Sequence, residues 1–233
     1  MESQDLTLGG GAGQTGTAAP GSLSRAERIA QLRKELAELE AEAELDTTTP
    51  LGVLRGIGAT MYERECRMGW TGSPLESINK LKPDNSGKVG ELFVTNMCAK
   101  AGIDCVYTED VNSTDGTYDA VINGKKVEIK TARLGVQKGF QHESLRSSGC
   151  DYYLFLDILP TGFYMTVLAS FDLTKQHPVI GRAPHCRKGT TDVFKFDFSE
   201  KNIQSAIKEG VAIKVDASTP MESIAEFLRK VIV

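Results

Sequence analysis

The chain has 233 residues, of which 40% are hydrophobic and 25% are charged, and its formal net charge is −4. This length and composition are typical of a globular protein that buries a substantial core, and no apolar run reaches the length of a membrane span. The acidic balance excludes a uniformly basic coat for nucleic acid, but it is compatible with a local basic groove.

The cysteine count and the N-terminus bear on the compartment. The five cysteines are odd in number and form no Cys-x-x-Cys pair: Cys66, Cys98, Cys105, Cys150 and Cys186. The N-terminus lacks the basic-then-apolar layout of a secretory signal. We therefore expect reduced thiols and a cytoplasmic, intracellular protein without a membrane anchor.

The first part of the chain predicts a flexible Gly-rich tail over 1–22 and an amphipathic or coiled-coil-like helix over 23–46. In that helix, apolar residues alternate spacings of three and four for about two heptads, at Ile29, Leu32, Leu36, Leu39 and Ala43. The pattern fits a helix packed on its own domain and a dimerisation helix equally well, because two heptads fall short of a secure coiled coil.

Residues 47–86 predict a helical and loop extension. Thr47–Pro50 breaks the first helix, a second helix is expected over Leu51–Met68, and Pro74 begins a short one after a Gly-rich loop. A further loop over Lys82–Gly87 precedes a helix that starts at Gly87 and is capped at its C-terminal end by Gly102.

The remainder, 87–233, mixes strand and helix signals. Strands are expected over Ile103–Tyr107, Tyr152–Ile158 and Phe163–Leu168; the second is a continuous apolar run, as in strands buried on both faces. Helices are expected from a Ser199 cap to Glu209, and over Met221–Val231 after a Thr219 or Ser218 cap. These elements predict an α/β fold with a short central mixed sheet flanked by helices and an N-terminal helical extension.

The most informative stretch is 118–130, with the sequence YDAVINGKKVEIK. Asn123-Gly124 strongly predicts a two-residue hairpin turn, which sets Asp119 opposite Glu128. Lys130 then shares the face of Glu128, while an apolar face points to the core. Because opposed like charges destabilise a sheet, these carboxylates call for a cation, and Mg²⁺ held by two carboxylates and waters fits.

An Asp followed one strand later by Glu-x-Lys resembles the PD-(D/E)XK nuclease superfamily, with Tyr118 standing where the family name has proline. The resemblance implies a restriction-endonuclease-like core over 87–233 that hydrolyses DNA phosphodiester bonds with Mg²⁺, for which Mn²⁺ substitutes. Asp119, Glu128 and the backbone carbonyl of Ile129 would hold the metal. Lys130 would assist the attacking water.

The resemblance extends on both sides of the hairpin. Upstream, 87–102 is similar to the first core helix, whose Glu91 would be an auxiliary catalytic residue. Downstream, Phe140–Arg146 is similar to the helix after the Glu-x-Lys strand, and Asp151–Asp157 to the next buried strand. Gln141 and His142 would then be auxiliary residues near the phosphate or the water; a solvent-facing helix start is the competing interpretation.

Basic and polar residues past the motif are the candidates for DNA contacts, and they are Thr131, Arg133, Lys138, Arg182, Arg187 and Lys188. Cutting both strands of a duplex usually requires two active sites, so a homodimer is expected, with the 24–45 helix as one means of forming it.

Other functions of the same sequence stay open. Within the enzyme class, a restriction-like enzyme, a branched-DNA resolvase, a phage or homing-type nuclease and a repair nickase are alternatives, as is an RNA nuclease on the same scaffold. From another class, a non-catalytic DNA-binding or assembly protein would use the tail and the first helix for docking. The opposed carboxylates and the lysine argue against this non-catalytic protein, since a site that has lost its catalytic function has no reason to keep them.

Overall fold

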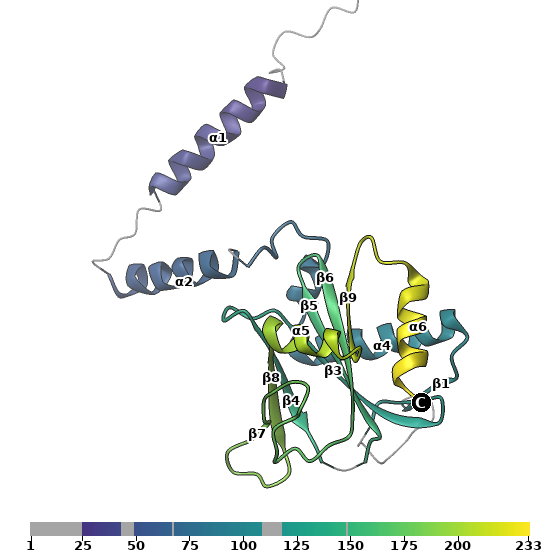
Figure 1. Cartoon of the computed structure of the whole chain (residues 1–233). Coiled ribbons are helices and arrows are strands. Elements are labelled where there is room, and N and C mark those ends of the chain that lie inside the picture. Colours follow the sequence, from purple (N-terminus) through teal and green to yellow (C-terminus); the bar gives the residue numbers. More distant parts are fainter. Residues whose placement is uncertain (1–24, 43–48, 67, 109–117, 148) are drawn as a thin grey trace, which may run out of the picture. The chain divides into compact units, whose positions relative to one another are not determined.

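The computed structural model describes residues 25–42, 49–66, 68–108, 118–147 and 149–233 (Figure 1). The chain divides into two compact units, Met1–Gly58 and Ala59–Val233. The predicted tail over 1–22 lies outside the described residues. Within the described ranges, no helix combines the length and the apolarity needed to cross a bilayer.

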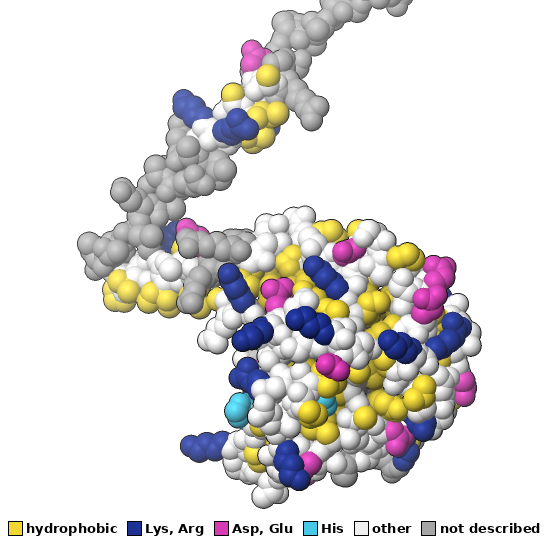
Figure 2. Space-filling model, viewed as in Figure 1, with side chains coloured by type: hydrophobic (Ala, Val, Ile, Leu, Met, Phe, Trp, Pro, Cys, Tyr) yellow, Lys and Arg dark blue, Asp and Glu magenta, His cyan; other side chains and the backbone are white. Residues whose placement is uncertain are grey.

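Two helices come first in the chain: α1 spans Arg25–Glu42 and α2 spans Pro50–Cys66, close to the predicted ranges. The hydroxyl of Thr49 accepts a 3.0 Å hydrogen bond from the backbone N–H of Gly52, which satisfies a donor in the first turn of α2. Figure 2 shows hydrophobic side chains in a row along α2, where Leu51, Leu54 and Ile57 are exposed.

The predicted heptad seam is only partly visible in α1. Ile29 and Leu32 are exposed, while the side chains of Leu36 and Leu39 lie outside the described part of the chain. The dimerisation helix therefore stays a prediction.

Six strands form the central sheet, in the order β1-β2-β3-β5-β6-β9. Their bounds are Cys105–Tyr107 for β1, Ala120–Ile122 for β2, Lys125–Arg133 for β3, Tyr152–Leu159 for β5, Gly162–Ala169 for β6 and Ala212–Asp216 for β9. Strands β3 and β5 are parallel and the other neighbours are antiparallel. The mixed sheet confirms the predicted α/β class.

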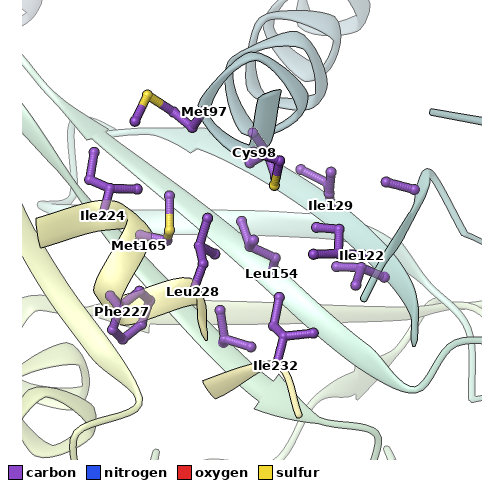
Figure 3. Packing of buried hydrophobic residues seen from close by; sticks show 14 of the residues in the cluster. Met97, Cys98, Ile122, Ile129, Leu154, Met165, Ile224, Phe227, Leu228 and Ile232 are labelled. Atoms are coloured by element: carbon purple, nitrogen blue, oxygen red, sulfur yellow. The ribbon is translucent and has the colours of Figure 1, made fainter. Parts of the chain in front are cut away.

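One face of this sheet packs against helices α4, Pro83–Ala101, and α6, Met221–Val231. Figure 3 shows how Met97 and Cys98 of α4 and Phe227 and Leu228 of α6 meet sheet residues such as Leu154. These side chains are nearly inaccessible to water, so removal of apolar surface from solvent fixes α4 on the sheet.

The opposite face is covered by helix α5, Glu200–Lys208, and by a second, three-stranded sheet that the sequence analysis did not predict. Its order is β4-β8-β7, with β4 over Gly139–Leu145, β7 over His185–Cys186 and β8 over Phe194–Ser199. Side chains of β5 alternate between the two layers, Leu154 facing α4 and Phe155 facing β8. Strand β5 is thus buried on both faces, as predicted.

The helix predicted over Phe140–Arg146 is wrong, because this segment is strand β4. Its side chains alternate with a period of two: Phe140 and His142 are buried, while Gln141 and Glu143 are exposed. Backbone pairing with β8, Phe140 opposite Phe198 and His142 opposite Phe196, satisfies the strand hydrogen bonds. Burial of an aromatic layer between the sheets outweighs any local helical preference here.

Two helix starts also differ from prediction. Helix α4 begins at Pro83 rather than at Gly87, since proline at the first helical position has a suitable φ and lacks only an N–H that would be unpaired there. Helix α6 follows Pro220 with no side-chain cap, rather than a Thr219 or Ser218 cap. By contrast, Ser199 caps α5 in a reciprocal capping box with Asn202, as predicted for the serine, and Gly102 ends α4 in the left-handed conformation.

The remaining short helix lies before α4. Helix α3 spans Glu76–Asn79, near the short helix predicted from Pro74. Its carbonyl end lies next to the end of β3, as the hydrogen bonds of Arg133 show below.

Candidate active site

The hairpin between β2 and β3 has the predicted turn and register. Asn123 and Gly124 have φ values of 50° and 76°, so both central residues take the left-handed conformation that a two-residue turn requires. Ala120 pairs with Val127, and the backbone N–H of Asp119 donates to the carbonyl of Val127 at 3.0 Å. Asp119 therefore stands beside Glu128 at the open end of the hairpin.

The Asp119 carboxylate is tied to the neighbouring strand. Its Oδ2 accepts a 2.7 Å hydrogen bond from the backbone N–H of Ile129, which fixes the carboxylate but leaves Oδ1 available. Burial and the nearby negative charge of Glu128 together raise the pKa of Asp119 to about 7, against the stabilising effects of the Ile129 bond and the Lys130 charge. Near neutral pH both the protonated and the ionised form of Asp119 are therefore populated.

Glu128 and Lys130 lie on one face of β3 and form an ion pair through Oε1 and Nζ. Their side chains are only 12% and 21% exposed, so water screens the pair less than a surface pair. Burial raises the pKa of Glu128, while the Lys130 charge and hydrogen bond act in the opposite direction. One half-buried lysine thus partly compensates two half-buried carboxylates.

Glu91 reaches the same region from helix α4. Its Oε2 accepts a 2.6 Å hydrogen bond from the Tyr107 hydroxyl, and Lys88 Nζ lies 3.9 Å from the same oxygen. Burial, with the Glu91 hydrogen bond second, raises the pKa of Tyr107 to about 12, so the phenol stays a donor. The charge of Glu91 contributes to the raised pKa of both Asp119 and Glu128, which places three carboxylates within electrostatic reach.

A groove of about 620 Å³ opens beside these residues. Its walls come from the start of α4, the second half of β3 and strand β4, and its lining includes Ser86, Glu91, Ile129, Lys130, Thr131, Arg133, Gln141, His142 and Glu143. Asp119 and Glu128 do not line it themselves. Glu91 and Lys130 are therefore the site residues that a ligand in the groove would meet first.

The donor set bears on the predicted metal. Among the residues that the structure describes, no group of three or more His, Cys, Asp and Glu side chains is arranged to hold a metal ion. The hairpin provides two half-buried carboxylates opposite each other. The bond from Ile129 engages only Oδ2 of Asp119, so Oδ1 is left for a cation. Two hard oxygen ligands suit Mg²⁺, which usually keeps several waters and completes its octahedron with substrate phosphate.

The two predicted auxiliary residues have different surroundings. Gln141 is exposed and lines the groove from β4. The imidazole of His142 is buried, and its Nε2 lies 2.8 Å from Asp157 Oδ1 on β5. His142 therefore ties the second sheet to the first, while Gln141 is the one whose side chain is open to a ligand.

The six predicted DNA-contact residues do not form one cluster. Thr131 and Arg133 line the groove. Lys138 and Arg182 line an adjoining pocket of about 360 Å³, which shares Gly135, Gly139 and Gln141 with the groove. Arg187 and Lys188 are exposed and line neither. Nη1 of Arg133 donates to the carbonyls of Ile78, Asn79 and Leu81 at 3.1, 2.5 and 3.0 Å. Its first role is therefore to fix the end of α3, which leaves its other nitrogens for a ligand.

Four residues of the site were missed by sequence reasoning. Lys88 and Tyr107 hold Glu91, the positive charge of Arg146 lowers the pKa of Glu128, and Ser86 contributes to the groove wall. A spacing of three residues on one helix was the available signal for Lys88. The other three come together only through the fold.

Comparison with protein-family models, with curated proteins and with solved structures finds no match for this chain.

Proposed function

We propose that this protein is a Mg²⁺-dependent DNA endonuclease that hydrolyses phosphodiester bonds, built on the PD-(D/E)XK pattern. The observation that carries the proposal is the pair Asp119 and Glu128, half-buried side by side at the open end of the hairpin, next to Lys130 at the edge of a groove. Both carboxyl groups have a raised pKa, and such clustered perturbed groups next to a cleft are typical of catalytic sites.

The order of elements adds support. Helix α4, strand β1, the β2–β3 hairpin and the parallel strand β5 follow the helix, strand, hairpin and buried strand of the resemblance. Strand β4 replaces the expected helix between β3 and β5, which is a departure from that pattern. The departure changes the wall of the groove rather than the hairpin that carries Asp119 and Glu128.

The chemistry divides between the metal and the chain. Mg²⁺, or Mn²⁺ in its place, would supply charge neutralisation at the phosphate and a water of lowered pKa when held by Asp119, Glu128 and the Ile129 carbonyl. The Ile129 N–H keeps Asp119 in position for this role. Lys130, which lines the groove, would place a positive charge beside the phosphate oxygens, whose negative charge grows in the transition state.

Glu91 would act next to the metal ligands, without binding the metal as a primary ligand. Its hydrogen bond to Tyr107 and its proximity to Lys88 hold it at the groove wall, where it can accept a hydrogen bond from a water molecule. Glu91 also adds negative charge that favours a cation between the hairpin and the helix. We propose that it is auxiliary rather than a primary metal ligand.

The proposed substrate would bind to a local surface with charges of both signs. Figure 2 shows Lys and Arg side chains interspersed with Asp and Glu on the face in view, rather than gathered into one basic field. The groove has Lys130 and Arg133 against Asp84, Glu91 and Glu143, so divalent cations would be needed for close approach of a strand. A homodimer would supply two sites for a duplex; sedimentation of the full chain and of Leu32→Glu tests this part.

The experiment that tests the function is cleavage of supercoiled plasmid, branched DNA, single-stranded DNA and RNA with Mg²⁺ or Mn²⁺. Asp119→Asn and Lys130→Met are compared with Asp172→Asn and Lys175→Met, matched exposed residues of a surface ion pair. Loss of metal-dependent cutting in the first two variants alone is expected. Equal cutting by all variants, or no cutting by folded wild type on any of these substrates, would overturn the proposal.

A further inference from the structure

The first turn of helix α4 forms one end of the groove. Pro83, Asp84, Ser86 and Gly87 line it, on the helix that carries Glu91 further along. No side chain caps this N-terminus, and the first helical hydrogen bond runs from the Ser86 N–H to the Lys82 carbonyl at 3.0 Å. In the part of the chain that the structure describes, the N–H groups of Asp84 and Asn85 therefore have no hydrogen-bond partner.

A second observation points to a ligand at the same place. Ser86 is only 4% exposed, and its hydroxyl has no hydrogen-bond partner among the described residues. Thr131 on β3 also lines the groove, but its hydroxyl, unpartnered among the described residues, lies against Gly90 of α4. Buried hydroxyl groups are nearly always paired in native proteins, so the orphaned Ser86 hydroxyl in the groove wall indicates a polar ligand or ordered water that completes it.

The chemistry of the donors selects the ligand. Free N–H groups at the start of a 19-residue helix present partial positive charge, which favours an anion, and the Ser86 hydroxyl beside them can donate to one of its oxygens. A phosphate group has several acceptor oxygens and meets all of these donors. We infer that the α4 N-terminus, with Ser86, binds a phosphate of the DNA backbone other than the phosphate at the bond that is cut.

This inference rests on the proposed nuclease function, and it fixes where the strand runs. Ser86 and Glu91 are five residues apart on α4, which corresponds to a rise of about 7.5 Å along the helix. A strand advances about 3.4 Å per nucleotide along a duplex axis, so the bound phosphate lies about two nucleotides from the bond opposite Glu91 and Lys130. The α4 N-terminus would thus set the register of the strand against the hairpin.

The neighbouring charges do not all favour an anion. Lys130 and Arg133 line the same groove, but Asp84 is an exposed carboxylate within the first turn itself. Its negative charge opposes a phosphate there, so Asp84→Asn is expected to tighten phosphate binding. This opposite sign makes Asp84→Asn a useful companion to Ser86→Ala.

The test is a titration of the full-length protein with inorganic phosphate, followed by ¹H–¹⁵N NMR at constant ionic strength. The amide signals of Asp84 and Asn85 are expected to shift and to reach saturation. Ser86→Ala should lower the affinity for phosphate about tenfold, because one hydrogen bond to a charged group is lost. Asp84→Asn should raise the affinity. Ser205→Ala, on exposed α5 surface, is the control and leaves the affinity unchanged. The thermal unfolding of Ser86→Ala is measured alongside, since loss of an orphaned hydroxyl should not lower its stability.

Three results would overturn the inference: no shift at these two amides, equal shifts in Ser86→Ala and wild type, or shifts spread evenly over surface lysines and arginines. A DNA strand is then added to the phosphate-bound protein and is expected to displace it. Failure of DNA to compete would overturn the assignment to a DNA strand. Cleavage is measured separately, so competition without cleavage would support the phosphate site and count against the nuclease alone.

Discussion

Nε2 of His142 lies 2.8 Å from Oδ1 of Asp157, and neither side chain is accessible to solvent. The imidazole sits against the rings of Phe155 and Phe198, with centroids 4.8 and 5.1 Å away. Burial raises the pKa of Asp157, and the histidine acts in the opposite direction. This polar pair inside an aromatic layer fastens β4, a wall of the groove, to β5 of the central sheet.

Removal of one member of this pair should be costly. Asp157→Ala leaves the imidazole buried without its partner, and we expect a loss of about 3–5 kcal/mol in the free energy of unfolding, measured by urea denaturation. The double variant His142→Phe with Asp157→Leu should lose less than Asp157→Ala, because neither polar group then remains. A loss below about 1 kcal/mol in the single variant would show that the pair is not a structural tie.

Stability should fall with rising pH because of Asp119. Its pKa is about 7 in the folded protein against 3.8 as the ordinary value, so the folded state holds the proton more tightly than the unfolded chain. This contribution is complete below about pH 3.8 and is lost as the pH rises through 7. Asp119→Asn should flatten this slope and, at pH 8 without metal, raise the unfolding free energy by on the order of 2 kcal/mol. Urea denaturation midpoints of both proteins from pH 4 to 8 measure this dependence. The same slope of stability against pH in Asp119→Asn and wild type would contradict the prediction.

Divalent cations should reverse that loss. Mg²⁺ that binds only the folded protein stabilises it by about 2.7 kcal/mol at a concentration one hundred times its Kd. The rise in unfolding temperature should be larger at pH 8 than at pH 6, because Asp119 must give up its proton to bind the cation. Glu128→Gln should abolish it, whereas Asp172→Asn should keep it. Equal stabilisation of wild type and Glu128→Gln would place the cation elsewhere.

Gly90 of α4 lies directly against Thr131 of β3. A Cβ at this position would lie 1.8 Å from Thr131 Oγ1, so Gly90→Ala should cost at least about 3 kcal/mol of stability and displace the neighbouring Glu91. Thr131→Ala in the same chain removes that contact, leaving 3.1 Å to the Cβ of residue 131 and 3.2 Å to Leu156 Cδ1, and should restore part of the loss. Denaturation of the two single variants and of the double variant measures this effect. If the losses of stability in the single variants simply add in the double variant, there is no direct clash.

The predictions from sequence succeeded where the signal lies within a few residues. Asn123-Gly124 set the hairpin register because a two-residue turn determines which residues face each other, and with it the meeting of Asp119 and Glu128. The apolar run at 152–158 and the Ser199 cap are signals of the same local kind.

The failures concern partners that are distant in the sequence. Strand β4 is a strand because β8 pairs with it more than 40 residues later, and no local pattern announces that partner. Arg133 looked like a free cation, yet the carbonyls that engage it belong to residues 78–81. The sequence shows that Arg133 is charged, but it does not show that its guanidinium donates hydrogen bonds to the carbonyls at the end of α3.

Pairing of β4 with β8 also affects the order in which parts of the site can fold while the chain is being synthesised on the ribosome. The hairpin closes through two residues, so Asp119 and Glu128 meet soon after β3 has emerged. The groove wall formed by β4 lacks its partner until residues 194–199 have been synthesised. A nascent chain would therefore carry its paired carboxylates well before the groove beside them is complete.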